Sequence, residues 1–277
     1  MATRPNVSSK DICFDVSIVD PHGHRVMRLL FVADLHYSLK QFDWVTNHAQ
    51  EYDLVAIGGD LLDLGSALDR DVQVVVMEKY LSRISQQTQL LVSSGNHDGT
   101  ERSEADESIA RWLQSTRSDR VRVDGESFER DGTLFTVCPW WDGPASRATL
   151  ESQLAADAQR PRKRWVWIHH APPQGSPTSW AGKKAVGDSS LFEWIGRHRP
   201  DLVLCGHIHN APFYAEGSWI DRIGDTWVFN PGRQIGPVPT HIEFDLEALE
   251  ARWRSLEGEV VRSLRASDSA AAGAAAC

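Results

Sequence analysis

The feature that most constrains this chain is a short apolar strand that stops in a turn of metal-binding and acid–base residues. Residues 90–92 are all aliphatic, and after two serines the chain continues as Gly95-Asn96-His97-Asp98. Glycine lets the backbone turn sharply beside a ligand, the Asn96 amide oxygen is a ligand for hard cations, and His97 exchanges a proton near neutral pH. Gly, Asn and Asp are also common turn formers, so this segment gains meaning from other strands that end in the same way.

Four other apolar runs end in residues of the same kinds. Strands predicted at residues 29–33, 54–57, 165–168 and 202–205 are each followed by carboxylates or imidazoles. The ends of these four strands and the turn after residues 90–92 together supply seven side chains: Asp34, His36, Asp60, Asn96, His169, His207 and His209. In chains that alternate strands with helices, ligands bind beyond the carboxyl ends of the strands. We therefore expect these seven side chains to meet at one edge of the fold.

This set of donors predicts a pair of divalent cations. Carboxylate, imidazole and amide oxygen suit hard to borderline ions such as Mn, Fe or Zn, and the four cysteines show no CxxC spacing. Seven ligands are too many for one tetrahedral ion, but they suit two ions that share a bridging carboxylate. The charge of two such ions exceeds that of Asp34 and Asp60, which leaves the site attractive to an anion such as a phosphate ester.

Composition narrows the class of protein further. The 277 residues carry a formal charge of −9, with no basic stripe, which disfavours nucleic acid and anionic membranes as partners. No apolar run approaches the roughly 20 residues of a membrane helix, and residues 1–10 lack the apolar core of a secretory signal. The scattered cysteines suggest free thiols in a reducing compartment. We therefore expect a cytoplasmic protein.

Predicted helices separate the predicted strands. Helices are predicted at about 41–52, 69–86, 103–113, 148–159 and 189–197. The second has apolar residues at helical spacing, the third is polar, and the last is capped by Asp188 or Ser189. Further strands are expected at 13–19, 120–123, 134–138 and 227–229. Residues 241–264 are open to a helix or to a hairpin, and the alternation of Ile242 and Phe244 with charged residues favours strands.

The chain is expected to form one domain over residues 1–265. Residues 266–277 are mostly Ala, Ser and Gly. Such a segment offers no bulky apolar face to bury, so we expect a disordered tail.

Taken in order, the strand-end motifs resemble those of the calcineurin-like metallophosphoesterase superfamily. The family pattern runs D-x-H, G-D, G-N-H-D/E, H and G-H-x-H. In this chain the blocks are Asp34-Leu35-His36, Gly59-Asp60, Gly95-Asn96-His97-Asp98, His169 and Gly206-His207-Ile208-His209. The resemblance implies an α/β fold, a four-layer α/β/β/α sandwich of two mixed β-sheets flanked by helices. It also implies a dinuclear metal site at the C-terminal edge of the strands.

The same resemblance implies a role for each residue. One metal would be held by Asp34, His36 and His209, the other by Asn96, His169 and His207, and Asp60 would bridge them. A water between the metals would be ionised near neutral pH and attack phosphorus in line. His97 would be the general acid, or would stabilise charge on the phosphoryl group, and Asp98 would orient it. His169 is preferred to His170 because the first histidine of the family's His-His-x-Pro pattern is the ligand; His170 would line the site or pack.

The implied activity is hydrolysis of a small phosphorylated substrate, either a phosphomonoester or a small phosphodiester. Two alternatives stay open: a nuclease of the same superfamily, which the acidic charge disfavours, and a non-catalytic scaffold, which the complete set of histidines disfavours. Trp140 and Trp141 either wall the pocket or pack under the sheet edge. Asp63 either accepts a hydrogen bond beside the site or caps a turn.

Overall fold

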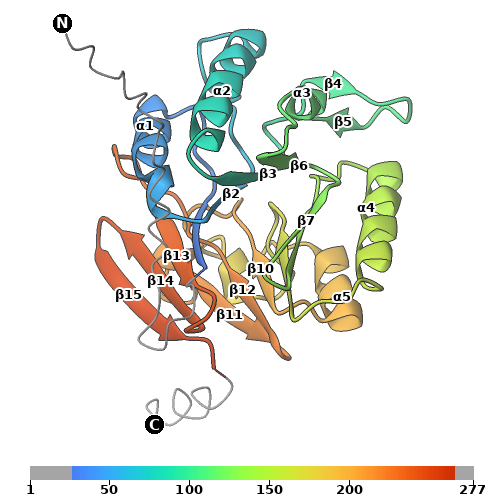
Figure 1. The fold of residues 1–277 in the computed structure, drawn as a ribbon, viewed down its shortest axis with the longest axis vertical. Coiled ribbons are helices and arrows are strands. Elements are labelled where there is room, and N and C mark those ends of the chain that lie inside the picture. The colour runs from blue at the N-terminus through green and yellow to red at the C-terminus, as the bar shows by residue number, and fades with distance from the viewer. Residues whose placement is uncertain (1–26, 266–277) are drawn as a thin grey trace, which may run out of the picture.

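The computed structural model describes residues 27–265, which form two large sheets with helices on both outer sides (Figure 1). The strands of the seven-stranded sheet are β1 (Arg28–Val32), β2 (Leu54–Gly58), β3 (Gln89–Ser93), β6 (Val121–Val123), β13 (His241–Asp245), β14 (Glu250–Ser255) and β15 (Gly258–Ser263). Those of the six-stranded sheet are β7 (Ser127–Arg130), β8 (Thr133–Val137), β9 (Arg164–Ile168), β10 (Leu202–Leu204), β11 (Ile220–Ile223) and β12 (Thr226–Phe229). A separate small hairpin joins β4 (Glu101–Arg102) to β5 (Ser108–Ile109).

The helices connect these strands. The α-helices are α1 (Leu39–His48), α2 (Arg70–Ser85), α3 (Arg111–Ser115), α4 (Pro144–Asp157) and α5 (Ser189–His198). Short 3-10 turns are η1 (Ala49–Glu51), η2 (Pro177–Ser179) and η3 (Ala211–Phe213). Asp188 caps α5, because its carboxylate accepts hydrogen bonds from two N–H groups of the first turn.

Both large sheets are mixed, as expected. The first has the order β15-β14-β13-β1-β2-β3-β6 and the second the order β11-β12-β10-β9-β8-β7. Within the first sheet β1, β2, β3 and β6 run parallel, while β13 is antiparallel to β1. In the second, β8, β9, β10 and β12 run parallel and the edge strands are antiparallel.

Side-chain alternation along each strand explains the layers. Leu29 and Phe31 of β1 pack between the sheets, because successive side chains of a strand point to opposite faces. Leu30 and Val32 pack instead against α1 and α2. Helices α4 and α5 cover the outer face of the second sheet in the same way. The central strands are therefore buried on both faces, which accounts for their continuous apolar sequences.

Most expected elements are confirmed, including strands rather than a helix over residues 241–264. The helix predicted at residues 103–113 is wrong: this region holds the β4–β5 hairpin, and α3 begins only at Arg111. The reason is a tertiary contact, since both oxygens of Glu107 accept hydrogen bonds from the N–H groups of Ala145 and Ser146 at 2.7 Å. The hairpin is thus tied to the first turn of α4. This long-range contact outweighs the local preference for a helix.

The strand predicted at residues 13–19 and the tail at 266–277 lie outside the described residues. Between residues 27 and 265, every helix falls short of the length and apolar character needed to cross a bilayer.

Candidate metal centre

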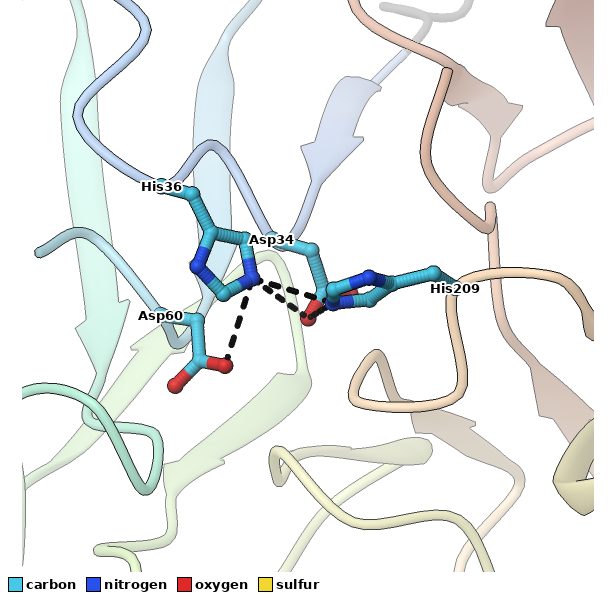
Figure 2. Close-up of side chains that lie close together, drawn as sticks. All are labelled: Asp34, His36, Asp60 and His209. Carbon is cyan, nitrogen blue, oxygen red and sulfur yellow. Dashed lines mark hydrogen bonds and ion pairs between the residues drawn. The ribbon is translucent and has the colours of Figure 1, made fainter. Parts of the chain in front are cut away.

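The turns after five central strands bring polar side chains to one edge of the two sheets. Four of these side chains lie close together: Asp34 and His36 after β1, Asp60 after β2, and His209 after β10 (Figure 2). Parallel strands end at the same edge of a sheet, and the two sheets are packed face to face. Motifs far apart in the chain therefore converge, as the strand-end pattern predicted.

The backbone of this edge is held in unusual conformations. Five non-glycine residues have positive φ: Asp34 (56°), His36 (42°), Tyr37 (56°), Asp60 (54°) and His207 (69°). Each left-handed residue costs about 1–2 kcal/mol, so other contacts must hold it. The first two turns are interlocked, because the N–H groups of Asp34 and His36 donate to the carbonyls of Gly59 and Asp60. Such strain is typical of functional sites.

The first group of donors has the geometry of a cation site. His36 Nε2 lies 3.0 Å from His209 Nε2, and His209 Nε2 lies 3.3 Å from Asp34 Oδ1. Asp60 Oδ2 lies 3.5 Å from His36 Nε2. Two nitrogens bound to a single ion at about 2.1 Å each are separated by a similar distance. Burial is the main reason that the pKa of His36 falls to about 4, which keeps the imidazole neutral, as a metal ligand must be.

A second group shares Asp60 with the first. His170 Nε2 lies 3.2 Å from Asp60 Oδ2 and 3.1 Å from Asn96 Oδ1, and His207 completes the group. His170 Nδ1 donates to the Gly58 carbonyl at 2.7 Å, so the lone pair of neutral His170 is on Nε2 and faces Asp60. The residues present therefore fit two cations that share one carboxylate.

The charges of the second group support the same conclusion. Burial lowers the pKa of His170, but the carboxylates of Asp60 and Asp34 outweigh it and raise that pKa to about 9. Without a metal, a proton on His170 balances the buried carboxylates, and a cation would take its place. Burial, assisted by the His170 charge, lowers the pKa of His207 to about 4.

The structure places His170, and not the expected ligand His169, beside this group. His169 is buried, and its Nε2 lies 3.7 Å from Asp188 Oδ2. The cause is strand alternation: Trp167 packs toward α5, whereas Ile168 packs between the sheets. His169 continues the first face and His170 the second, a parity that the sequence already contained.

The Asp98 carboxylate, which was expected to orient His97, makes its hydrogen bonds with backbone groups. Asp98 is fully buried, and its carboxylate accepts hydrogen bonds from the N–H groups of Leu61, Leu62 and Gly95. Burial and the neighbouring Asp60 raise the pKa of this carboxyl to about 7. Asp98 therefore fixes the backbone that follows Asp60.

His97 is oriented by another group of that loop. The Leu64 N–H donates to His97 Nδ1 at 3.3 Å, and His97 Nε2 lies 3.9 Å from Asp60 Oδ2. Its ring packs edge-on against His36, with centroids 4.5 Å apart. A carboxylate oxygen of Asp63 lies within 4.8 Å of this pair, and Asp63 Oδ1 accepts from the Gly65 N–H. Asp63 is thus a turn cap that also lies beside the site.

Two further side chains border the site. The Trp140 ring lies 5.7 Å from His170 and 5.5 Å from His207, measured between centroids, so Trp140 walls the centre. Trp141 turns away and donates from Nε1 to Asp188. Arg233 was missed by the sequence reasoning: its N–H donates to the His209 carbonyl, and its charge contributes to the lowered pKa of His36. Its position in the sequence could have indicated it, because Arg233 directly follows residues 230–232, the segment after the end of β12.

Comparisons with known proteins agree with this geometry. The model of the protein family described as calcineurin-like phosphoesterase matches residues 27–211. This span contains both donor groups. No curated protein of similar sequence matches.

Several solved structures share the fold. They include a protein of Thermus thermophilus (TM-score 0.54, 15% identity, 87% of this chain and 100% of that chain) and a dimetal phosphatase from Danio rerio (TM-score 0.53, 11% identity, 87% and 99%). A purple acid phosphatase from yellow lupin seeds also matches (TM-score 0.54, 12% identity), and this chain spans 54% of its length. At these identities the likeness establishes the fold alone. The family match covers most of the chain and contains the convergent aspartates and histidines, so the chain belongs to the calcineurin-like phosphoesterase family.

Proposed function

We propose that this protein hydrolyses a phosphomonoester or a small phosphodiester with the help of two divalent metal ions. The observation that carries the proposal is the position of Asp60, whose carboxylate belongs to both donor groups. Asp60 is almost fully buried, and a buried carboxylate between imidazoles needs compensating positive charge. A shared cation pair would supply that charge.

The ligand set would follow the two groups. Asp34, His36 and His209 would hold one ion, Asn96, His170 and His207 the other, and Asp60 both. When bound, such ions supply Lewis acidity and a more acidic water. The nitrogen and oxygen donors suit Mn, Fe or Zn.

His97 would stabilise the leaving oxygen in this reaction. Because the Leu64 N–H donates to Nδ1, the proton of neutral His97 is on Nε2, the nitrogen that faces Asp60. A phosphoryl group held over the donor groups would place its leaving oxygen within reach of that Nε2–H. His97 would then donate a hydrogen bond to the departing oxygen and stabilise the charge that develops on it.

Arg233 would hold the phosphoryl group from the opposite side. Its guanidinium makes no ion pair or side-chain hydrogen bond within residues 27–265, although it is half-buried. The loop that carries it is fixed, since the Asn230 side chain donates to the carbonyls of Thr178 and Ile208. A free guanidinium on a rigid loop is well suited to binding phosphate oxygens.

Metal analysis and hydrolysis assays test the proposal. The protein is reconstituted with Mn, Fe or Zn and assayed on p-nitrophenyl phosphate and on bis(p-nitrophenyl) phosphate, which separates monoesterase from diesterase activity. We expect about two ions per chain and turnover of at least one ester. Fully loaded protein that is inert on both esters would contradict the proposal.

A further inference from the structure

A cavity of about 790 Å³ lies beside the metal centre, between the β4–β5 hairpin, α3 and the start of α4. This volume falls within the roughly 300–1,000 Å³ of small-molecule sites. Its wall is partly apolar, with Ile109, Ala110, Pro139 and Ala145 among the lining residues. The mechanism described above uses none of these side chains.

The cavity and the metal centre share a wall. Trp140 lines the cavity, and its ring also lies against His170 and His207. Gly95 lines the cavity too, and it precedes the proposed ligand Asn96. A β-carbon at Gly95 would come within 2.2 Å of Asp60 Oδ1, so the backbone that separates the two spaces is only one residue thick. The cavity and the metal centre are therefore adjoining spaces.

The charges of the cavity disfavour a second anion. Two carboxylates line it, from Glu104 and Glu107, against the single cation of Arg111. That guanidinium is already paired with Glu101 at 3.1 Å.

The start of α4 is no anion site either. A helix N-terminus ordinarily attracts anions, but Glu107 already accepts the N–H groups of Ala145 and Ser146. The lining thus combines apolar surface with net negative charge.

We propose that this cavity receives the organic group of the ester and selects aromatic or other partly apolar groups, uncharged or cationic, over groups that carry a carboxylate or further phosphate. The inference rests on the proposed phosphoesterase centre, because the phosphoryl group must be held there. Trp140 offers the organic group an aromatic surface, and the acidic residues repel a second anion.

Binding of phosphonates, which cannot be hydrolysed at the P–C bond, tests this apart from turnover. Calorimetry on Mn-loaded protein compares methylphosphonate, phenylphosphonate, 4-(aminomethyl)phenylphosphonate and 4-carboxyphenylphosphonate. We expect the phenyl compound to bind about 10-fold tighter than the methyl compound. The carboxyphenyl compound should bind about 5-fold weaker than the phenyl compound, a repulsion typical of partly exposed charges. Equal affinities for all four would overturn the proposal.

Variants locate the effect in the cavity. Ala105→Trp and Thr149→Trp fill it from opposite walls at exposed positions, so folding should survive. Each should reduce the phenyl advantage to about 2-fold while methylphosphonate binds as before. An undiminished phenyl advantage in both folded variants would place the aryl group elsewhere and overturn the proposal.

A charge reversal with a matched control completes the test. Glu104→Lys should improve carboxyphenylphosphonate binding about 3-fold. The control variant Glu247→Lys makes the same charge reversal in the β13–β14 turn. This turn lies at the opposite end of the sheet, since Asp245 pairs with Arg28 at the start of β1. The control should leave the affinity for carboxyphenylphosphonate unchanged. Equal effects of the two variants would overturn the charge selection. If methylphosphonate does not bind to metal-loaded protein and no ester is turned over, the proposed centre itself has failed.

Discussion

The metal centre and the neighbouring cavity are built on different principles. Asp34, Asp60 and His170 are almost fully buried and are fixed by backbone hydrogen bonds at the ends of central strands. The cavity is built from a short hairpin, a five-residue helix and the first turn of α4, with exposed residues such as Glu104 and Ala105. For the proposed enzyme, we therefore expect reaction chemistry to depend on the rigid sheet edge, and substrate choice to depend on added surface elements, which tolerate change more readily.

The largest expected effect is on the shared carboxylate. Asp60→Asn removes the charge common to both donor groups, so the protein should lose metal and its ester hydrolysis should fall by more than about 100-fold, the upper limit for groups that only support a ligand. Metal content by elemental analysis and kcat/KM are measured together. Full metal content with near-normal activity would remove Asp60 from the centre.

His97→Ala should cost turnover without costing metal. Loss of a hydrogen-bond donor to the developing charge lowers the rate by about 100-fold or more, and His97 belongs to neither of the two groups that contain Asp60. Asp98→Asn is the informative companion, because Asp98 reaches His97 only through the backbone after Asp60. Its effect on kcat should be smaller, and an equal loss would instead support a direct role for Asp98.

His169 and His170 give a sharper test of which residues bind the metal ions. His170→Ala should weaken metal affinity by about 100-fold, because His170 lies next to Asp60 and Asn96. His169→Ala should leave metal stoichiometry intact and lower stability, since His169 is buried beside Asp188. Competition with a chelator and chemical denaturation separate the two outcomes; the reverse pattern would restore His169 as the ligand.

The last effect is on stability and not on activity, and it concerns Asp124, which forms the floor of the cavity. Shielding from solvent raises the pKa of Asp124 to about 7, although hydrogen bonds from Ser94 oppose the shift. In the unfolded chain this pKa is about 3.9, so the contribution of Asp124 to stability is complete below pH 4 and is lost as the pH rises through 7. Relative to wild type, Asp124→Asn should therefore gain up to about 4 kcal/mol in unfolding free energy between pH 4 and pH 8, since one pKa unit corresponds to about 1.4 kcal/mol.

A matched substitution controls for the loss of a charge. Asp119 is exposed and makes no ion pair or side-chain hydrogen bond within residues 27–265. Denaturation of Asp119→Asn at the same two pH values should show no such gain. A pH-independent difference for Asp124→Asn would mean that its carboxyl is ionised in the folded state and that the cavity floor is charged at neutral pH.

Local patterns in the sequence predicted much of this structure. Apolar runs such as residues 90–92 and 54–57 predicted buried strands, because a strand covered on both faces needs apolar side chains throughout. Their polar endings predicted a metal centre, because parallel strands deliver their carboxyl ends to one edge. Both inferences use only residues close together in the sequence. The order of the motifs carried the family resemblance, and the family and the two mixed sheets that it implied are confirmed.

Contacts between distant residues decided the rest. Whether His169 or His170 faces Asp60 depends on which face of β9 meets the other sheet. The hairpin at residues 101–109 forms because Glu107 caps a helix that begins 37 residues later, and the cavity exists because of that hairpin. Packing of this kind depends on three-dimensional neighbours that no local spacing of residues encodes.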